Sequence, residues 1–138
     1  MCRKVCGRSF IGVFPCDIQP EVRRKTFSIV FNTGDSSTAG EHFVAIFSTR
    51  RTMFYFDSFG KKPTDNNIKK FIAKTKGRKR FIHWKKQIQH SMSNYCGFYC
   101  IGYLLHKHKN IQSFRKYFNA NNLMQNDGQI VKFIVKNV

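Results

Sequence analysis

A cysteine, a glutamine and a glycine share one short segment, and their spacing is typical of a thiol nucleophile. The segment reads QHSMSNYCGFYC from Gln89 to Cys100, so Gln89 lies seven positions before Cys96, and Gly97 follows that cysteine directly. The apolar, proline-free run after Cys96 predicts a helix that begins there, where unpaired N–H groups and the helix dipole favour thiolate over thiol. The amide of Gln89 could then donate to an oxyanion beside the sulfur.

A histidine and an aspartate at the ends of two predicted strands supply a base and its partner. A thiol with a pKa of about 8.5 is mostly protonated at neutral pH, so a nucleophilic cysteine benefits from a base. His42 precedes the apolar stretch 43–47 and Asp57 follows the stretch 53–56, which predicts a hairpin with connection 48–52. Strand residues should pair where their numbers add up to about 100, so His42 and Asp57 meet at one edge of the sheet. An imidazole–carboxylate couple requires this geometry.

The other four histidines lack a comparable partner. His83 lies within a predicted strand, and His90 lies in the loop before the cysteine with nothing to orient it. His106 and His108 lie at a Lys-rich helix end, where they are expected to cap carbonyl groups. His42 is therefore the preferred base.

Zinc binding is a competing use for the cysteines. Cys2 and Cys6, like Cys96 and Cys100, are separated by three residues, so neither pair forms the two-residue knuckle of a zinc finger. We predict no metal site, and we interpret Cys100 as a core residue one helical turn beyond Cys96.

The elements that position these residues predict an α+β fold. We expect a small mixed or antiparallel sheet packed against helices, with the nucleophile at a helix N-terminus. The predicted strands are 27–31, 43–47, 53–56 and 81–89, and the predicted helices lie within 66–75, from Cys96 to about 108, over 114–118, and after a cap at Asn126 or Asp127. A chain of 138 residues has the length of one domain, so we expect a single domain over residues 1–138.

The charge is strongly unbalanced. The chain has 25 Lys and Arg against 7 Asp and Glu, a formal net charge of +18, which indicates a polyanionic partner. Nucleic acid is the leading candidate, and an acidic protein or a membrane surface is less favoured. The densest basic stretch is predicted to bind phosphates without reading sequence; its members are Lys69, Lys70, Lys74, Lys76, Arg78, Lys79, Arg80, Lys85 and Lys86. A nuclear localisation signal is the competing use of residues 76–80.

The sequence shows no signal peptide or membrane-spanning stretch, and its cysteines are not spaced for disulfides. We therefore expect a reducing, intracellular compartment. Every apolar stretch is far shorter than the roughly 20 residues that cross a bilayer, and residues 1–16 lack the apolar core of a signal peptide. The five cysteines are odd in number and are not spaced as a disulfide scaffold. We expect no membrane partner, and we expect a monomer.

Five blocks of the chain, taken in order, resemble the adenovirus maturation proteases (the adenain family) and, more distantly, the SUMO-specific proteases of the same clan. The resemblance spans roughly residues 6–108, and the last block is the most specific because both the Gln-to-Cys spacing and the Cys-Gly pair agree. The blocks are Cys6-Gly7 with Phe10 to Phe14, Ile29 to Thr33, Gly40 to Ala45, Phe54 to Gly60, and Gln89 to Cys100.

The resemblance implies a cysteine endopeptidase with its site between the sheet and the cysteine-bearing helix. It implies Cys96 as the nucleophile, His42 as the base and Asp57 as the group that orients the base. Gln89 would line the oxyanion hole with the backbone N–H of Cys96. The implied substrates are viral capsid or core precursor proteins, cleaved after small residues such as Gly during virion maturation, and the implied locations are the virion and the host nucleus.

The resemblance also implies DNA as a polyanionic cofactor. Adenoviral members are activated by a peptide that is disulfide-linked to a cysteine upstream of the nucleophile, but Asp17 to Tyr95 contains no cysteine. A peptide activator would therefore have to bind without that disulfide. Two further departures are Phe43 where the family usually has Trp, and Asp57 where many adenoviral members have Glu and the SUMO-protease branch has Asp.

Two alternative functions remain open from the sequence. The first is a peptidase that acts on ubiquitin-like conjugates of the SUMO type. The second is a basic nucleic-acid-binding protein that has the protease fold without its activity.

Overall fold

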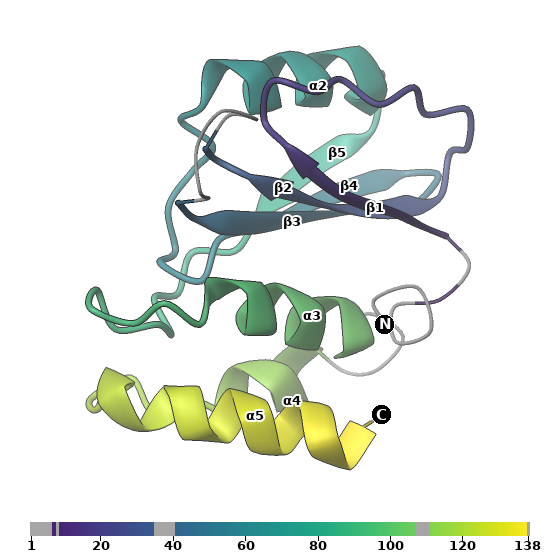
Figure 1. Ribbon diagram of the computed structural model, residues 1–138. Helices are drawn as coiled ribbons and strands as arrows, with labels where there is room; N and C mark the ends of the chain where they lie inside the picture. Colours follow the sequence, from purple (N-terminus) through teal and green to yellow (C-terminus); the bar gives the residue numbers. More distant parts are fainter. Residues whose placement is uncertain (1–6, 8, 35–40, 107–110, 138) are drawn as a thin grey trace.

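The computed structural model describes residues 7, 9–34, 41–106 and 111–137. A five-stranded sheet lies between α2 on one face and α3 on the other, and α4 and α5 lie beyond α3 (Figure 1). The strands are β1 (Phe10–Pro15), β2 (Phe27–Asn32), β3 (Phe43–Ser48), β4 (Thr52–Phe56) and β5 (Arg80–His83). The helices are α2 (Asn66–Lys76), α3 (Cys96–His106), α4 (Ile111–Lys116), the 3₁₀ turn η1 (Leu123–Gln125) and α5 (Asn126–Asn137).

The sheet is mixed, and its strands lie side by side in chain order. β2, β3 and β4 pair antiparallel, whereas β1 runs parallel to β2 and β5 runs parallel to β4. The predicted α+β class, with a small sheet packed against helices, is confirmed.

The sheet buries apolar side chains on both of its faces, which explains why its central strands read as nearly continuous apolar runs. Successive residues of a strand point to opposite faces. Ile29 and Phe31 pack with α2, whereas Val30 between them packs with α3. The α3 side of the core continues into α4 and α5 through Phe114 and Ile130.

Local sequence signals set the limits of α2. The Asp65 side chain accepts a hydrogen bond from the backbone N–H of Ile68 at 3.0 Å, as an N-terminal cap does. Lys74 and Lys76 lie in the last turn, where cations interact favourably with the helix dipole, and Gly77 ends the helix with a φ of +56°.

The helix α3 is apolar on most of its surface because it lies between the sheet and α5. Gly102 permits α5 to approach closely, since a Cβ atom at this position would overlap the side chain of Ile130. No helix among the described residues has both the length and the apolar character needed to cross a membrane.

One predicted strand is too long, and one strand was not predicted. The strand predicted over 81–89 ends at His83, because the chain then leaves the sheet. Its remaining apolar residues, Trp84 and Ile88, are buried in the core beside α3 rather than paired in the sheet. The structure also contains β1, which was not predicted as a strand.

The β3–β4 hairpin is tighter than predicted. Its connection is 49–51 rather than 48–52, and Ser48 pairs with Met53, so the register is shifted by one residue. The N–H of Thr49 donates to the carbonyl of Thr52 at 2.8 Å and closes the turn.

The helices follow the predicted order with shifted limits. The α4 helix spans Ile111–Lys116 instead of 114–118, and the two residues predicted as alternative caps of α5, Asn126 and Asp127, are its first two residues. The last residues predicted for α3, 107 and 108, lie outside the described residues.

Candidate active site

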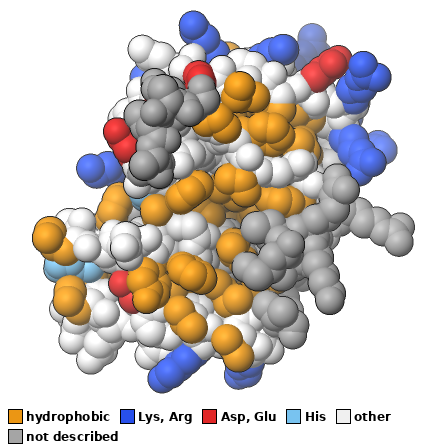
Figure 2. Space-filling view, in the orientation of Figure 1, with side chains coloured by type: hydrophobic (Ala, Val, Ile, Leu, Met, Phe, Trp, Pro, Cys, Tyr) orange, Lys and Arg blue, Asp and Glu red, His pale blue; other side chains and the backbone are white. Residues whose placement is uncertain are grey.

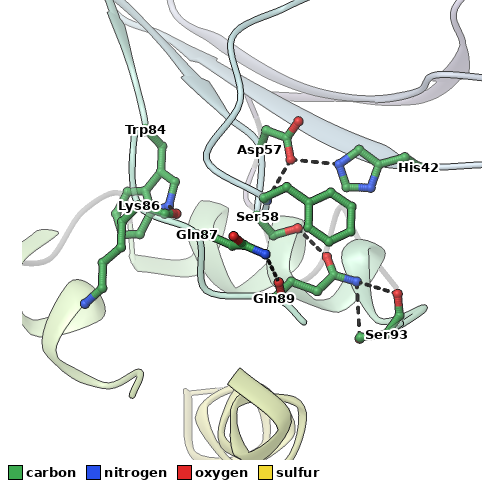
Figure 3. Close-up of polar contacts among 9 residues, drawn as sticks. His42, Asp57, Ser58, Trp84, Lys86, Gln87, Gln89 and Ser93 are labelled. Atoms are coloured by element: carbon green, nitrogen blue, oxygen red, sulfur yellow. Dashed lines mark hydrogen bonds and ion pairs between the residues drawn. The ribbon is translucent and has the colours of Figure 1, made fainter. Parts of the chain in front are cut away.

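A histidine–aspartate pair lies at the open end of the β3–β4 hairpin. His42 directly precedes β3 and Asp57 directly follows β4, so antiparallel pairing brings them together. The Nε2 atom of His42 is 2.8 Å from Oδ1 of Asp57 (Figure 3). The two side chains are 18% and 8% exposed, so the pair is largely shielded from water.

The turn after β4 fixes the carboxylate and the imidazole ring. The backbone N–H of Phe59 donates to Oδ1 of Asp57 at 2.8 Å, so this oxygen accepts two hydrogen bonds. The Phe59 ring stacks on the His42 ring with centroids 4.7 Å apart and an interplanar angle of 21°. Phe59 lies in the turn that follows β4 and not on a strand, so strand pairing gave sequence reasoning no signal for its contact with His42.

Cys96 is the first residue of α3, and its thiol lies beside the imidazole. Because Nε2 of His42 is held by Asp57, Nδ1 is the ring nitrogen left for the sulfur. Burial alone would raise the pKa of Cys96. The hydrogen bond with His42 and the backbone N–H groups of Phe43 and Gly97 outweigh burial and hold this pKa below its ordinary value.

The pKa of His42 is shifted in the opposite direction, upward. Burial alone would lower the pKa of His42, but the hydrogen bonds with Asp57 and Cys96 and their negative charges raise it to about 9. A raised imidazole pKa beside a lowered thiol pKa favours the thiolate–imidazolium pair at neutral pH. The site can therefore present an anionic sulfur next to a group that can donate a proton.

Gln89 is fully buried between the turn after β4 and the loop before α3. Its Oε1 accepts a hydrogen bond from the Ser58 hydroxyl, and its Nε2 donates to the carbonyl oxygen of Ser93 at 3.0 Å and to the Ser93 hydroxyl at 3.2 Å (Figure 3). Both of these contacts of the amide nitrogen are thus with Ser93. The oxyanion-hole role of Gln89 stays a prediction, and it requires that one of these contacts be exchanged for the substrate oxygen.

Gly60 joins the Asp57 turn to the segment that carries Gln89. Its φ is +75°, and a Cβ atom there would lie 2.8 Å from the carbonyl oxygen of Lys85 and 2.9 Å from the nitrogen of Gln87. Only glycine fits this position. The carbonyl of Ser58 also accepts the N–H groups of Ile88 and Gln89, at 2.9 and 3.1 Å. One turn therefore positions both the aspartate and the glutamine.

The predicted phosphate-binding residues lie along α2 and around β5. Most of them are exposed, but two are engaged within the fold. Lys79 donates to the carbonyl of Lys25 at 2.7 Å and lies 5.4 Å from the centroid of the Phe27 ring. Burial, and then the charge of Lys25, lower the pKa of Lys79. Lys86 donates to the carbonyl of Arg115 at 3.2 Å.

Five basic residues that sequence reasoning missed complete a pocket of about 520 Å³. The missed residues are Arg23, Arg24, Lys25, Arg50 and Arg51, and they join Lys76, Arg78 and Lys79 in the pocket wall. The signal that could have found them is topological: the basic residues precede β2, connect β3 to β4 and precede β5, and those three points meet at one end of the sheet. A second pocket, of about 1110 Å³, is lined in part by Lys62, Lys69, Lys76, His83 and Lys85.

The three described cysteines, Cys16, Cys96 and Cys100, are thiols and not disulfides. Cys16 donates from Sγ to the carbonyl of Thr33 at 3.2 Å, and Cys96 and Cys100 are buried in or beside α3. Within the described ranges, no group of three or more His, Cys, Asp or Glu residues is arranged to hold a metal ion. Cys2 and Cys6 lie outside those ranges.

The fold is similar to that of a known protease. A selenomethionine crystal structure of the ASFV pS273R protease superposes with a TM-score of 0.56 at 23% sequence identity, over 82% of this chain and 44% of that chain. The present chain thus corresponds to less than half of that protein. The sequence matches no family model and no curated protein.

Proposed function

We propose that this protein is a cysteine endopeptidase that cleaves viral capsid or core precursor proteins during virion maturation. The observation that carries the proposal is the 2.8 Å contact between His42 and Asp57 beside Cys96, whose thiol pKa is held below its ordinary value. The similarity in fold to a viral protease and the sequence resemblance to the adenain family both support it.

The geometry supports acyl transfer through a thioester. The thiolate of Cys96 attacks the scissile carbonyl carbon, and the resulting oxyanion accepts hydrogen bonds from the backbone N–H of Cys96 and the amide of Gln89. The His42 imidazolium gives its proton to the leaving amine as the C–N bond breaks. His42 then takes a proton from water as the water oxygen attacks the thioester, and cleavage of the C–S bond releases the carboxylic acid and restores the thiolate–imidazolium pair. Asp57 holds the ring orientation and stabilises its charged form.

A narrow approach to the sulfur favours small residues at the cleavage site. Cys96 is only 5% exposed, and the ring of Phe43 lies 3.6 Å from the position that a Cβ atom would take on Gly97. The Phe43 ring thus packs against the first turn of α3, and a site so confined favours a small residue next to the scissile carbonyl. We therefore propose cleavage after Gly, and a peptide with a Gly-Gly bond is the appropriate first substrate.

The decisive experiment compares the wild-type protein with Cys96→Ala on such a peptide. Cleavage by the wild type and none by the variant is the expected result; equal turnover would reject the assignment. A SUMO- or ubiquitin-fused reporter, offered in parallel, distinguishes a peptidase for ubiquitin-like conjugates from a maturation protease.

A thiol-reactive probe tests the non-enzymatic alternative. Selective alkylation of Cys96 at mildly acidic pH indicates an activated thiolate. Alkylation of Cys16, Cys96 and Cys100 in proportion to exposure would instead favour an inactive, basic nucleic-acid-binding protein.

DNA is proposed as a polyanionic cofactor, bound without sequence preference in the virion and the host nucleus. The 520 Å³ basic pocket is a suitable binding surface, because eight Lys and Arg side chains line it without a carboxylate. It lies at the end of the sheet opposite to His42 and Asp57, separated from them by the six residues of β3, or roughly 20 Å. DNA bound there would leave the catalytic residues accessible to a polypeptide. A peptide activator that binds without a disulfide is compatible with this arrangement.

A further inference from the structure

The first turn of α5 contacts the loop that precedes the nucleophile. The carboxylate of Asp127 accepts two hydrogen bonds on Oδ1, one from the Ser93 hydroxyl at 2.8 Å and one from the Tyr99 hydroxyl at 2.9 Å. Its neighbour Asn126 is fully buried and donates from Nδ2 to the carbonyl of Ile88 at 2.8 Å. Consecutive residues of α5 therefore hold the Gln89 segment at both of its ends.

The hydrogen-bonding capacity of each group determines how the Ser93 hydroxyl is oriented. A carboxylate only accepts hydrogen bonds, so the single hydroxyl proton of Ser93 must point to Asp127. The lone pairs of that oxygen then face the two remaining donors, Nε2 of Gln89 and the backbone N–H of Tyr95, both at 3.2 Å. The carboxylate thus makes Ser93 an acceptor toward Gln89.

The same reasoning fixes the orientation of the Gln89 amide. The carbonyl of Ser93 only accepts hydrogen bonds, so Nε2 rather than Oε1 must face it, and Oε1 is left for the Ser58 hydroxyl. The Tyr95 N–H that contacts Ser93 belongs to the residue directly before Cys96. The Ser93 side chain therefore connects both candidate oxyanion donors, the Gln89 amide and the backbone at Cys96.

We infer that Asp127 is a positioning residue for the proposed peptidase reaction, acting through Ser93 on the orientation of the Gln89 amide and of the backbone before Cys96. This inference rests on the proposed function. Asp127 does not reach the sulfur itself; it acts through the groups that would bind the transition-state oxyanion. Its loss should therefore lower kcat and leave KM nearly unchanged, because oxyanion contacts form in the transition state.

The test is a double-mutant cycle on the peptide cleavage reaction, with active sites titrated by a thiol reagent. Asp127→Ala is expected to lower kcat about tenfold with KM within about twofold of wild type. In a Gln89→Ala background the same change should lower kcat by a smaller factor, since one of the two groups through which Asp127 acts is gone. Asp127→Asn, which can keep an acceptor oxygen toward Ser93, should retain most of kcat.

Two further variants separate positioning from stability. Ser93→Ala should reproduce the kcat loss of Asp127→Ala, and it keeps the inference testable if that variant does not fold. Tyr99→Phe removes the other hydrogen bond to Asp127, so it should lower Tm while most of kcat is retained.

The outcomes distinguish this inference from the proposed function. Losses that multiply in the double variant, or equal kcat values for Asp127→Ala and wild type, would overturn the role of Asp127 while cleavage that depends on Cys96 still stands. An inactive wild-type protein would overturn the proposed function, and the positioning role with it.

Discussion

The sulfur of Cys96 and the ring of His42 interact, so they titrate as a pair. Because the pKa of His42 is raised to about 9, its charged form persists below that pH and is lost as the pH rises through it. The pKa of Cys96 is lowered, so the thiolate is present above that value and is lost as the pH falls through it. The reactive ion pair therefore exists in a window between the two macroscopic steps.

This pairing predicts a bell-shaped pH profile. We expect kcat/KM to fall on the alkaline side near pH 9, and iodoacetamide to alkylate Cys96 well below the ordinary thiol pKa. In His42→Ala the alkylation should follow the ordinary titration of a thiol at about pH 8.5. Superimposable alkylation profiles for the two proteins would show that the histidine does not activate the sulfur.

A second prediction at the residue scale concerns Gln89. Gln89→Ala should lower kcat by about 10²-fold, because an oxyanion donor is lost in the transition state. Gln125→Ala, a change of the same residue type at an exposed position on η1, is the matched control and should leave kcat unchanged. An unaltered kcat in Gln89→Ala would remove Gln89 from the oxyanion hole and leave it a buried structural residue.

The sequence predicted which of these residues meet, but not how each is held. Antiparallel pairing alone places His42 beside Asp57, and a one-residue error in register does not separate them because both lie at the strand ends. The contacts of Gln89 with Ser58 and Ser93 could not be predicted. They depend on how two loops pack, and loop packing leaves no periodic signal in the sequence.

At the scale of elements, α3 carries a buried histidine at its C-terminal end. His106 is 3% exposed, its ring stacks on Phe114 with centroids 4.4 Å apart, and its Nδ1 has no hydrogen-bond partner among the described residues. Burial lowers the pKa of His106 to about 4, which the hydrogen bonds to backbone groups only partly offset. His106 was predicted to cap carbonyl groups; its ring hydrogen-bonds to the backbone of Tyr103 and Gly102 in α3, and it does so from a buried position against Phe114 of α4.

This burial predicts a specific acid sensitivity. Between pH 6.5 and about 4 the unfolded chain binds a proton at His106 that the folded chain does not, so stability falls as the pH falls through that range. The shift corresponds to up to about 3 kcal/mol. His106→Phe should remove this part of the pH dependence in urea unfolding measured at pH 7 and pH 4.5. If the wild type and His106→Phe lose the same unfolding free energy between these two pH values, groups other than His106 cause the acid sensitivity.

Elements with strong periodicity or clear end signals were predicted well. The Asp65 cap and Gly77 mark the ends of α2, and the uninterrupted apolar run marks α3. The strand predicted over 81–89 was wrong beyond His83, because an alternating apolar pattern reports burial and not hydrogen-bonded pairing. Trp84 and Ile88 are buried, as the alternating pattern requires, although they lie in a segment without regular secondary structure.

At the scale of the whole molecule, charge and hydrophobicity are distributed unevenly. On the face shown in Figure 2, hydrophobic side chains gather across the middle of the molecule, and most Lys and Arg side chains lie at its rim. The basic pocket and the His42–Asp57 pair occupy opposite ends of one sheet. The sequence predicted a basic surface from the run 76–80. Arg50 and Arg51 are distant from this run in the sequence, and the turn between β3 and β4 places them beside it.

This separation predicts that DNA affinity and basal catalysis can be changed independently. Arg50→Glu combined with Arg51→Glu should weaken binding to duplex DNA. The slope of log K against log salt should become shallower by roughly 0.9 for each phosphate that the protein no longer neutralises. Peptide cleavage without DNA should be unchanged, since these residues lie roughly 20 Å from the site.

The control for local charge is Lys132→Glu, at an exposed position on α5. If this single change weakens DNA binding as much per charge as the pocket variant does, the net charge of the protein and not the pocket governs affinity. Fluorescence anisotropy over a range of salt concentrations measures both variants.

The close packing of Gly60 against the backbone of 85–87 has a consequence for inhibition. The Asp57 carboxylate and the Gln89 amide are both positioned by this one contact between two backbone segments. A molecule that separates the two segments would therefore displace both groups without binding the Cys96 thiol. Such a compound would not need an electrophile, and added reducing agents would not reverse its effect. It would also spare cysteine enzymes whose sulfur is equally reactive but whose loops meet through a larger residue.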